Sequence, residues 1–146
     1  MHYTAAADTV HITSTLSLES ATGTPAYMSP EQWGEGNTDR QTDIWSVGVL
    51  LHRCVSGYLP FGDGCAVKLK IAMEVLSPHS QAPCLIHGYE ENFPIDPSLA
   101  LIVRTALRKD KSKRYRDAKD MLAALRPVYE CIQVTTYLST HRKFKK

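Results

Sequence analysis

The sequence predicts a mainly α-helical protein with an irregular N-terminal segment. An apolar stretch from Asp43 to Gly57 lies between a residue that often caps helices and a residue that often ends them. A second stretch, Leu99 to Leu107, places apolar side chains at i, i+3, i+4, i+7 and i+8, which is the spacing of one helix face. By contrast, residues 23–42 are rich in glycine and proline, which break regular structure.

Size and composition fit one globular domain. The chain has 146 residues and a mass of 16.3 kDa, with 43% hydrophobic and 22% charged residues. These values argue against a disordered or a collagen-like chain. No apolar run approaches the ~18 residues that a membrane helix needs, so we expect no membrane span. The first residues do not have the pattern of a secretory signal.

The cysteines and histidines favour a protein inside the cell, cytoplasmic or nuclear. None of the four cysteines forms a C-x-x-C pair, and reduced thiols are the simpler reading, with a disulfide framework as the alternative. The six histidines show no metal-ligand spacing, so we expect no metal site.

The N-terminal third divides into two segments. Residues 1–22 keep neither the helical nor the strand period, which predicts a mobile segment. The following residues, 23–42, are expected to be ordered but irregular, with one short helix from Pro30 to Trp33. The helix over 43–57 is apolar on nearly every side, which is typical of a buried central helix; Asp43 would be its N-cap and Gly57 its end.

The rest of the chain is expected to alternate turns and helices. A turn at 58–63 leads to a helix over 65–76, and a loop over 77–95 follows. Asp96 and Pro97 are the expected cap and first residue of the next helix. A last helix runs from Asp117 to Arg126, where Pro127 is expected to end it. These limits define a central unit, 23–126, and a basic tail, 127–146, readable as a weak strand or a frayed end.

Charge is distributed unevenly along the chain. Residues 1–100 hold 11 acidic and 4 basic residues, whereas residues 101–146 hold 4 acidic and 13 basic ones. A basic face can contact nucleic acid or lipid headgroups, but more often it is a solvated helix face. We expect the solvated face and no nucleic-acid partner.

Four short segments, in order, resemble eukaryotic-type protein kinases. GTPAYMSPE at 23–31 resembles the end of the kinase activation segment, with Ser29-Pro30-Glu31 in the place of the A-P-E signature. DIWSVGV at 43–49 resembles the start of the central helix of the C-terminal lobe, and LPFGD at 59–63 the turn after it. KDKSKRY at 109–115 resembles the segment that gives an arginine to the A-P-E glutamate. GTPAY is similar to the serine/threonine group.

The resemblance implies a partial kinase C-terminal helical lobe with an activation segment. It implies a buried salt bridge between Glu31 and Arg114, and a second role for Asp43 as an anchor of the catalytic loop. It implies phosphorylation at Ser20 or Thr22, with ordinary loop hydroxyls as the alternative. The residues implied to form a substrate-docking loop are Ala21, Thr24, Pro25, Tyr27 and Met28.

Arg53 departs from the family pattern, because many serine/threonine kinases have an acidic residue there that binds basic substrate residues. One hypothesis is that the parent kinase does not prefer arginine upstream of its target. The alternative is that Arg53 simply reaches solvent.

The catalytic motifs of a kinase are missing from these 146 residues. We find no Gly-rich loop, strand lysine, H-R-D or D-F-G, so we expect no catalytic residue, no metal and no cofactor here. ATP and Mg²⁺ are implied for the complete kinase, with a protein or peptide substrate and the missing upstream half as partners. The expected function is part of a serine/threonine kinase, inactive alone. The alternative is a non-catalytic binding module or pseudokinase-like docking protein.

Overall fold

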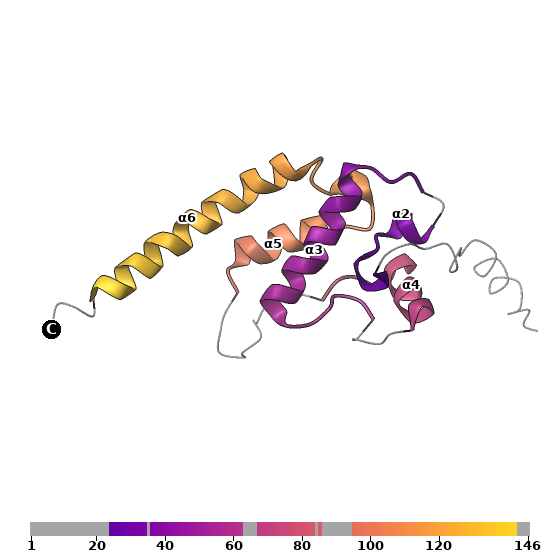
Figure 1. Cartoon of the computed structure of the whole chain (residues 1–146), viewed down its shortest axis with the longest axis horizontal. Helices are drawn as coiled ribbons and strands as arrows, with labels where there is room; N and C mark the ends of the chain where they lie inside the picture. The colour runs from indigo at the N-terminus through magenta and orange to yellow at the C-terminus, as the bar shows by residue number, and fades with distance from the viewer. Residues whose placement is uncertain (1–23, 35, 63–66, 84, 86–94, 143–146) are drawn as a thin grey trace, which may run out of the picture.

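The protein is a set of helices packed around the central helix α3 (Figure 1). The computed structural model describes residues 24–34, 36–62, 67–83, 85 and 95–142. Within these residues there is no strand, which confirms the mainly helical fold class. The elements in chain order are η1 (Pro25–Tyr27), α2 (Pro30–Trp33), α3 (Arg40–Ser56), α4 (Lys68–Leu76), α5 (Pro97–Ala106), η2 (Lys111–Lys113) and α6 (Ala118–Arg142).

Two apolar clusters hold the helices together, one on each side of α3. The larger cluster joins α3 to α2, α4 and α5; its buried members are Met28, Trp33, Trp45, Val49, Phe61, Ile71, Ala72, Val75, Leu85, Val103 and Leu107. The smaller cluster joins α3 to α5 and α6 through Ile44, Ile102, Ala106, Met121 and Val128. Because α3 contributes to both, it is the centre of the fold, as its apolar sequence predicted.

The cap of α3 differs from the expected one. Asp39, not Asp43, is the N-cap: its carboxylate accepts from the amide of Gln41 at 2.8 Å, and the Thr42 hydroxyl closes a capping box. Asp43 lies in the first helical turn and is exposed. Both aspartates suit a cap, and the hydroxyl three residues after Asp39 decides between them. The expected end is confirmed, since Gly57 has φ 80° and donates to the Arg53 carbonyl at 2.8 Å.

Close contact between α3 and α5 depends on a glycine. A Cβ added to Gly48 would lie 2.8 Å from the Cβ of Ala106. Two small residues therefore let the two helix backbones approach more closely than larger side chains would permit. The start of α5 is as predicted: Asp96 accepts from the amides of Ser98 and Leu99, and Pro97 is the first helical residue.

The last helix is longer than predicted. Asp117 receives the amide of Asp120 at the expected start, but α6 continues through Pro127 to Arg142. Proline removes the hydrogen bond to Ala123, but both residues are exposed, so water reaches the freed carbonyl. Val128, next in the chain, is buried in the smaller cluster and holds the helix past the proline. Beyond that contact, α6 extends away from the other helices (Figure 1).

The other short elements follow the sequence pattern closely. The helix α2 spans the predicted residues, with Ser29 as its cap and Gln32 completing a capping box. The helix α4 ends at Leu76, as predicted, but begins at Lys68 rather than at Cys65; residues 65 and 66 lie outside the described residues.

Candidate functional site

The N-terminal segment is joined to the late loop by a buried ion pair. Glu31, in α2, faces Arg114, which follows η2 and lies 83 positions further along the chain. Arg114 Nη1 donates to Glu31 Oε1 at 2.7 Å and Nη2 to Oε2 at 2.9 Å. The side chain of Arg114 is fully buried, and that of Glu31 is 9% exposed. The pair is thus bidentate and shielded from water, the geometry in which arginine binds a carboxylate most strongly.

Every N–H of the Arg114 guanidinium has an acceptor. Besides the two bonds to Glu31, Nε donates to the carbonyl of Arg108 at 2.6 Å, Nη1 to that of Gln41 and Nη2 to that of Lys109, both at 3.1 Å. The guanidinium carbon also lies 5.0 Å from the centre of the Trp45 ring. One side chain therefore ties together α2, the start of α3 and the loop after α5.

The Glu31 carboxylate is kept ionised by its neighbours. Burial raises the pKa of Glu31, but hydrogen bonds from Arg114 and Thr42, with the Arg114 charge, outweigh burial and hold that pKa below its usual value. The Thr42 hydroxyl donates to Oε1 at 3.0 Å. Hence Thr42 serves twice, as a partner of Glu31 and in the cap of α3.

A second set of contacts, absent from the sequence reasoning, ties the late loop to α3. Gln41 Nε2 donates to the Lys111 carbonyl at 2.7 Å, and Lys111 Nζ reaches Asp39 at 2.7 Å. Contacts between residues at least 70 positions apart leave no periodic signal in a sequence. The order of the motifs was the one available hint that these segments meet.

Two stacked rings and the Lys109 ammonium lie beside the ion pair. Trp45 and Phe61 are parallel within 6°, with ring centres 5.5 Å apart. Lys109 Nζ lies 5.4 Å from the Phe61 ring and donates to the carbonyls of Glu74 and Ser77 at the end of α4. Phe61, in the turn that follows α3, is thereby fixed between α3 and the loop that carries Arg114.

The docking segment that the resemblance implied lies against α3. Thr24 is exposed at the start of η1, whereas Met28 is buried in the larger cluster. Ser46 of α3 donates to the Tyr27 carbonyl at 3.0 Å, which fixes the segment's backbone. Pro25, the first residue of η1, is half-buried. Ser20, Ala21 and Thr22 lie outside the described residues.

Arg53 is exposed and also contacts the segment before α2. Its Nη1 donates to the Tyr27 hydroxyl at 2.8 Å. The same tyrosine is therefore held twice by α3, at its carbonyl by Ser46 and at its hydroxyl by Arg53. Asp43 lies on the exposed side of α3.

Neither a metal-ligating cluster nor a membrane-spanning helix is found among the described residues. No group of three histidine, cysteine, aspartate or glutamate side chains among them could hold a metal ion. None of the described helices is long and apolar enough to cross a membrane.

Comparison with known proteins defines the class of this helical assembly with its buried Glu–Arg pair. The protein kinase domain family matches residues 6–125. The serine/threonine-protein kinase PknL of Mycobacterium tuberculosis is 36% identical over 109 residues, which cover 74% of this chain and 25% of PknL. The serine/threonine-protein kinase pkn2 of Myxococcus xanthus is 35% identical over 115 residues, covering 78% of this chain and 13% of pkn2.

This chain belongs to the protein kinase family. A third relative, the serine/threonine-protein kinase PksC of Streptomyces coelicolor, is 33% identical over 99 residues, or 68% of this chain and 16% of PksC. The chain thus spans a quarter or less of the length of these three relatives, all of which are serine/threonine kinases.

Proposed function

We propose that this chain is the substrate-docking and helical part of a serine/threonine protein kinase. In the complete enzyme a preceding segment would supply the nucleotide site and catalytic loop, and phosphate would pass from ATP to a serine or threonine of a protein substrate. The observation that carries the proposal is the buried pair of Glu31 and Arg114, inside the residues that match the kinase family. This ion pair anchors the segment from Thr24 to Glu31, which contains the proposed docking residues.

The docking segment is suited to hold a peptide in extended form. Tyr27 is fixed at both its carbonyl and its hydroxyl, and Met28 is buried, so the backbone between Thr24 and Met28 is preorganised. Thr24 remains exposed and would face the catalytic aspartate of the preceding segment. Ala21, Pro25 and Met28 would line the apolar pocket for the substrate residue that follows the target.

One face of α3 is exposed and largely apolar. We propose that the preceding segment of the complete kinase packs against this face. Asp43, Val47, Leu50 and Cys54 recur at helical spacing, and all four are exposed; Val47 is 41% and Leu50 50% exposed. A helix that packs against other helices on two sides and still exposes apolar residues on a further face needs another partner there. In this arrangement Asp43 would accept hydrogen bonds from the catalytic loop.

Two further assignments concern charge. Phosphate on Ser20 or Thr22 would add about −1.5 to −2 charge and order the segment against an arginine of the catalytic loop.

Arg53, held by Tyr27, places a positive charge beside the docking segment. We propose that it disfavours arginine upstream of the target residue. The setting would be inside the cell, where Mg²⁺ and ATP are present.

The test is a chimaera. Residues 6–125 of this chain replace the matching segment of PknL from M. tuberculosis, and transfer of radioactive phosphate from ATP to a generic protein substrate is measured. We expect transfer by the chimaera and none by the 146-residue chain alone. A chimaera that folds and binds ATP but transfers no phosphate would overturn the proposal.

The second function, a non-catalytic docking module, is separated by the same assay. A docking module predicts that the chain alone is a stable monomer that binds a peptide or protein partner. It also predicts that the chimaera transfers no phosphate. The exposed apolar face of α3 favours the kinase part, because a free module is expected to carry polar residues there.

A further inference from the structure

A groove rich in basic side chains lies between the segment after α4 and the C-terminal end of α5. Its volume is about 170 Å³, which is room for several water molecules or for one small anion such as phosphate. The end of α5 and the loop after it bring four cations and one carboxylate to its lining: Arg104, Arg108, Lys109, Lys113 and Asp110. The charge of this lining is therefore +3.

The two arginines of the groove have no partner among the described residues. Arg104 lies in the last turn of α5, and Arg108 follows just after the helix ends; both are exposed. Neither guanidinium makes a hydrogen bond or an ion pair within the described part of the chain. Two like charges that line one groove repel each other, and an anion between them would remove that repulsion.

The carboxylate in this lining does not neutralise the arginines, because other groups engage it. Asp110 Oδ1 accepts from the amide of Ser112 at 3.0 Å and from its hydroxyl at 2.7 Å, and Oδ2 lies 3.3 Å from Lys113 Nζ. These neighbours hold the pKa of Asp110 below its usual value. Lys109 Nζ donates to two backbone carbonyls at the end of α4, so it adds fixed positive charge behind the arginines.

We propose that this groove binds a phosphate monoester carried by a protein segment, a phosphoserine or a phosphothreonine. The planar fork of an arginine matches two phosphate oxygens, and the group carries about −1.5 to −2 charge at pH 7. Phosphate between Arg104 and Arg108 would use both forks. The Ser80 hydroxyl and the Gln81 amide, from the opposite wall, are further donors for it.

The apolar part of the lining favours a protein segment over a nucleic acid. Pro78, Ala82 and Leu107 line the same groove and offer contact to the carbon atoms beside a phosphate. A nucleic acid is held by many cations along its backbone, whereas the two unpaired arginines converge on one groove. The inference rests on the proposed function for its ligand class, because a serine/threonine kinase makes such groups on proteins. Binding is nevertheless measured without phosphate transfer.

The probe is a short fluorescent peptide of alanines with one central phosphoserine. Matched peptides carry serine or glutamate at the centre, and inorganic phosphate is tested as a competitor. Fluorescence anisotropy measures binding to the 146-residue chain and to the chimaera without ATP, so that the stability of one protein does not decide the result. We expect the phosphopeptide to bind at least about tenfold more tightly than the serine peptide, since hydrogen bonds to charged groups are the strong ones. Glutamate and inorganic phosphate should each bind more weakly than the phosphopeptide.

Two variants and a matched control locate the site. Arg104→Gln and Arg108→Gln should each weaken the phosphopeptide about tenfold and leave the serine peptide unchanged. Arg40→Gln removes the same charge at the exposed first residue of α3, outside the groove, and should change neither affinity. Circular dichroism checks that each variant is folded.

Several outcomes would overturn the inference: equal binding of the phosphoserine and serine peptides, no loss in either groove variant, or inorganic phosphate that binds as tightly as the phosphopeptide. Tighter binding of a single-stranded RNA or of phosphatidylserine vesicles, lost in the same two variants, would also overturn it. A chimaera that binds the phosphopeptide but transfers no phosphate would contradict the proposed function alone. A chimaera that transfers phosphate but does not bind the phosphopeptide would contradict this inference alone.

Discussion

At the scale of single residues, Arg114 has the most demanding environment in the described chain. Its guanidinium uses all five N–H groups, two on a carboxylate and three on backbone carbonyls. Lysine has the same charge but one compact ammonium group, so it cannot reproduce this planar arrangement. Loss of the fork would leave buried acceptors on three segments.

We therefore expect Arg114→Lys to lower the free energy of unfolding by about 1–3 kcal/mol, because lysine keeps the charge but leaves buried acceptors without their donors. Urea unfolding measures it. The control is Arg116→Lys, because Arg116 also makes a bidentate pair, with Asp120, but its side chain is 83% exposed. Equal losses in the two variants would contradict the special role of Arg114.

Stability should fall in acid because of Glu31. The pKa of Glu31 is lowered in the folded state from its usual 4.5, so the unfolded chain takes up protons first as the pH falls. The stabilisation is therefore complete above about pH 4.5 and lost as the pH falls through the folded-state value. Urea midpoints measured from pH 6 to pH 3 should decline less in Glu31→Gln. An unchanged decline would show that other carboxylates cause it.

The residue scale also marks the limit of sequence reasoning. The pairing of Glu31 with Arg114 was predicted from the order of the kinase-like motifs. No local pattern could predict it, because the two residues are 83 positions apart. The contacts of Gln41 and Lys111 were not predicted, because they join segments that only the folded geometry brings together. Arg53 was expected in solvent or near substrate, and its contact with Tyr27 needs two separate segments in place.

At the scale of elements, the crossing of α3 and α5 depends on Gly48. Alanine there would bring a Cβ within 2.8 Å of Ala106. Overpacking costs about 1–3 kcal/mol, and the better helix propensity of alanine offsets about 1 kcal/mol of it. We expect a net loss in urea unfolding for Gly48→Ala. Adding Ala106→Gly should restore part of the loss. A stabilised Gly48→Ala variant would contradict close packing.

The helix α6 shows why an element's existence is easier to predict than its end. Its start at Asp117 follows from the capping residue, but Pro127 misled the prediction of its end, because burial of Val128 outweighs the broken hydrogen bond. The same reasoning led to the wrong cap for α3. For α6 a tertiary contact of Val128 decided the outcome, whereas for α3 a local signal, the Thr42 hydroxyl that completes the Asp39 capping box, was missed.

Pro127→Ala should accordingly stabilise the protein, by up to about 3 kcal/mol, since proline inside a helix removes a hydrogen bond and crowds the preceding turn. Urea unfolding and the helical circular dichroism signal both report it. A control, Ala123→Gly in the preceding turn, should destabilise the same helix. If Pro127→Ala lowered stability, the helix would end near Arg126, as the sequence pattern alone suggested.

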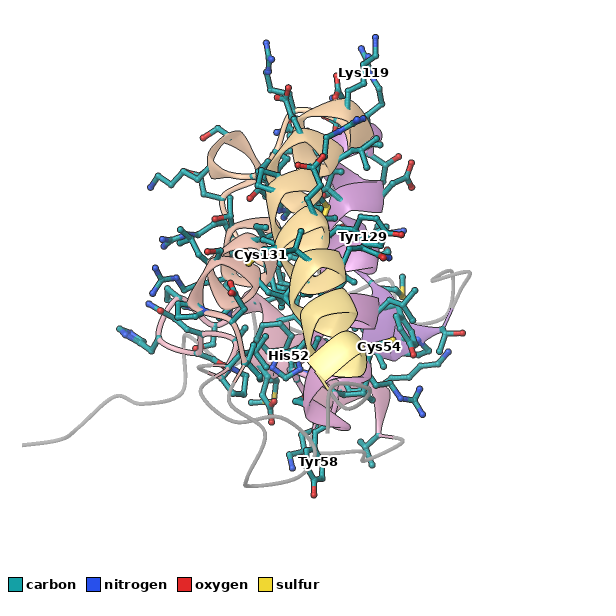
Figure 2. All side chains as sticks on the ribbon, turned by 90° about the vertical axis from the view of Figure 1, so that its left-hand side faces the viewer. His52, Cys54, Tyr58, Lys119, Tyr129 and Cys131 are labelled. Carbon is teal, nitrogen blue, oxygen red and sulfur yellow. The ribbon has the colours of Figure 1, made fainter. Side chains whose placement is uncertain are left out.

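At the scale of the whole molecule, exposed apolar side chains predict self-association of the isolated chain. Val47 and Leu50 lie open on α3, and α6 extends beyond the body with Tyr129 and Cys131 exposed (Figure 2). Sedimentation velocity should show oligomers that decrease when Val47 and Leu50 are both replaced by lysine. Met73→Lys, at a 60% exposed position on α4, is the control. A monomer with one sharp unfolding transition would contradict this prediction.

The helical class and the central position of α3 could be predicted from periodicity and motif order. The contacts of Gln41 and Lys111 could not, because each joins two segments at least 70 positions apart that no pattern connects. The apolar sequence of α3 predicted a helix buried on all sides, but one face of α3 is exposed.

The most direct test of the central claim is to sequence the transcript upstream of the Met1 codon. If the chain is the docking part of a kinase, the reading frame should continue into a Gly-rich loop, a strand lysine, H-R-D and D-F-G. An in-frame stop codon with none of these motifs before it would contradict that claim, and the non-catalytic docking module would then be the better account.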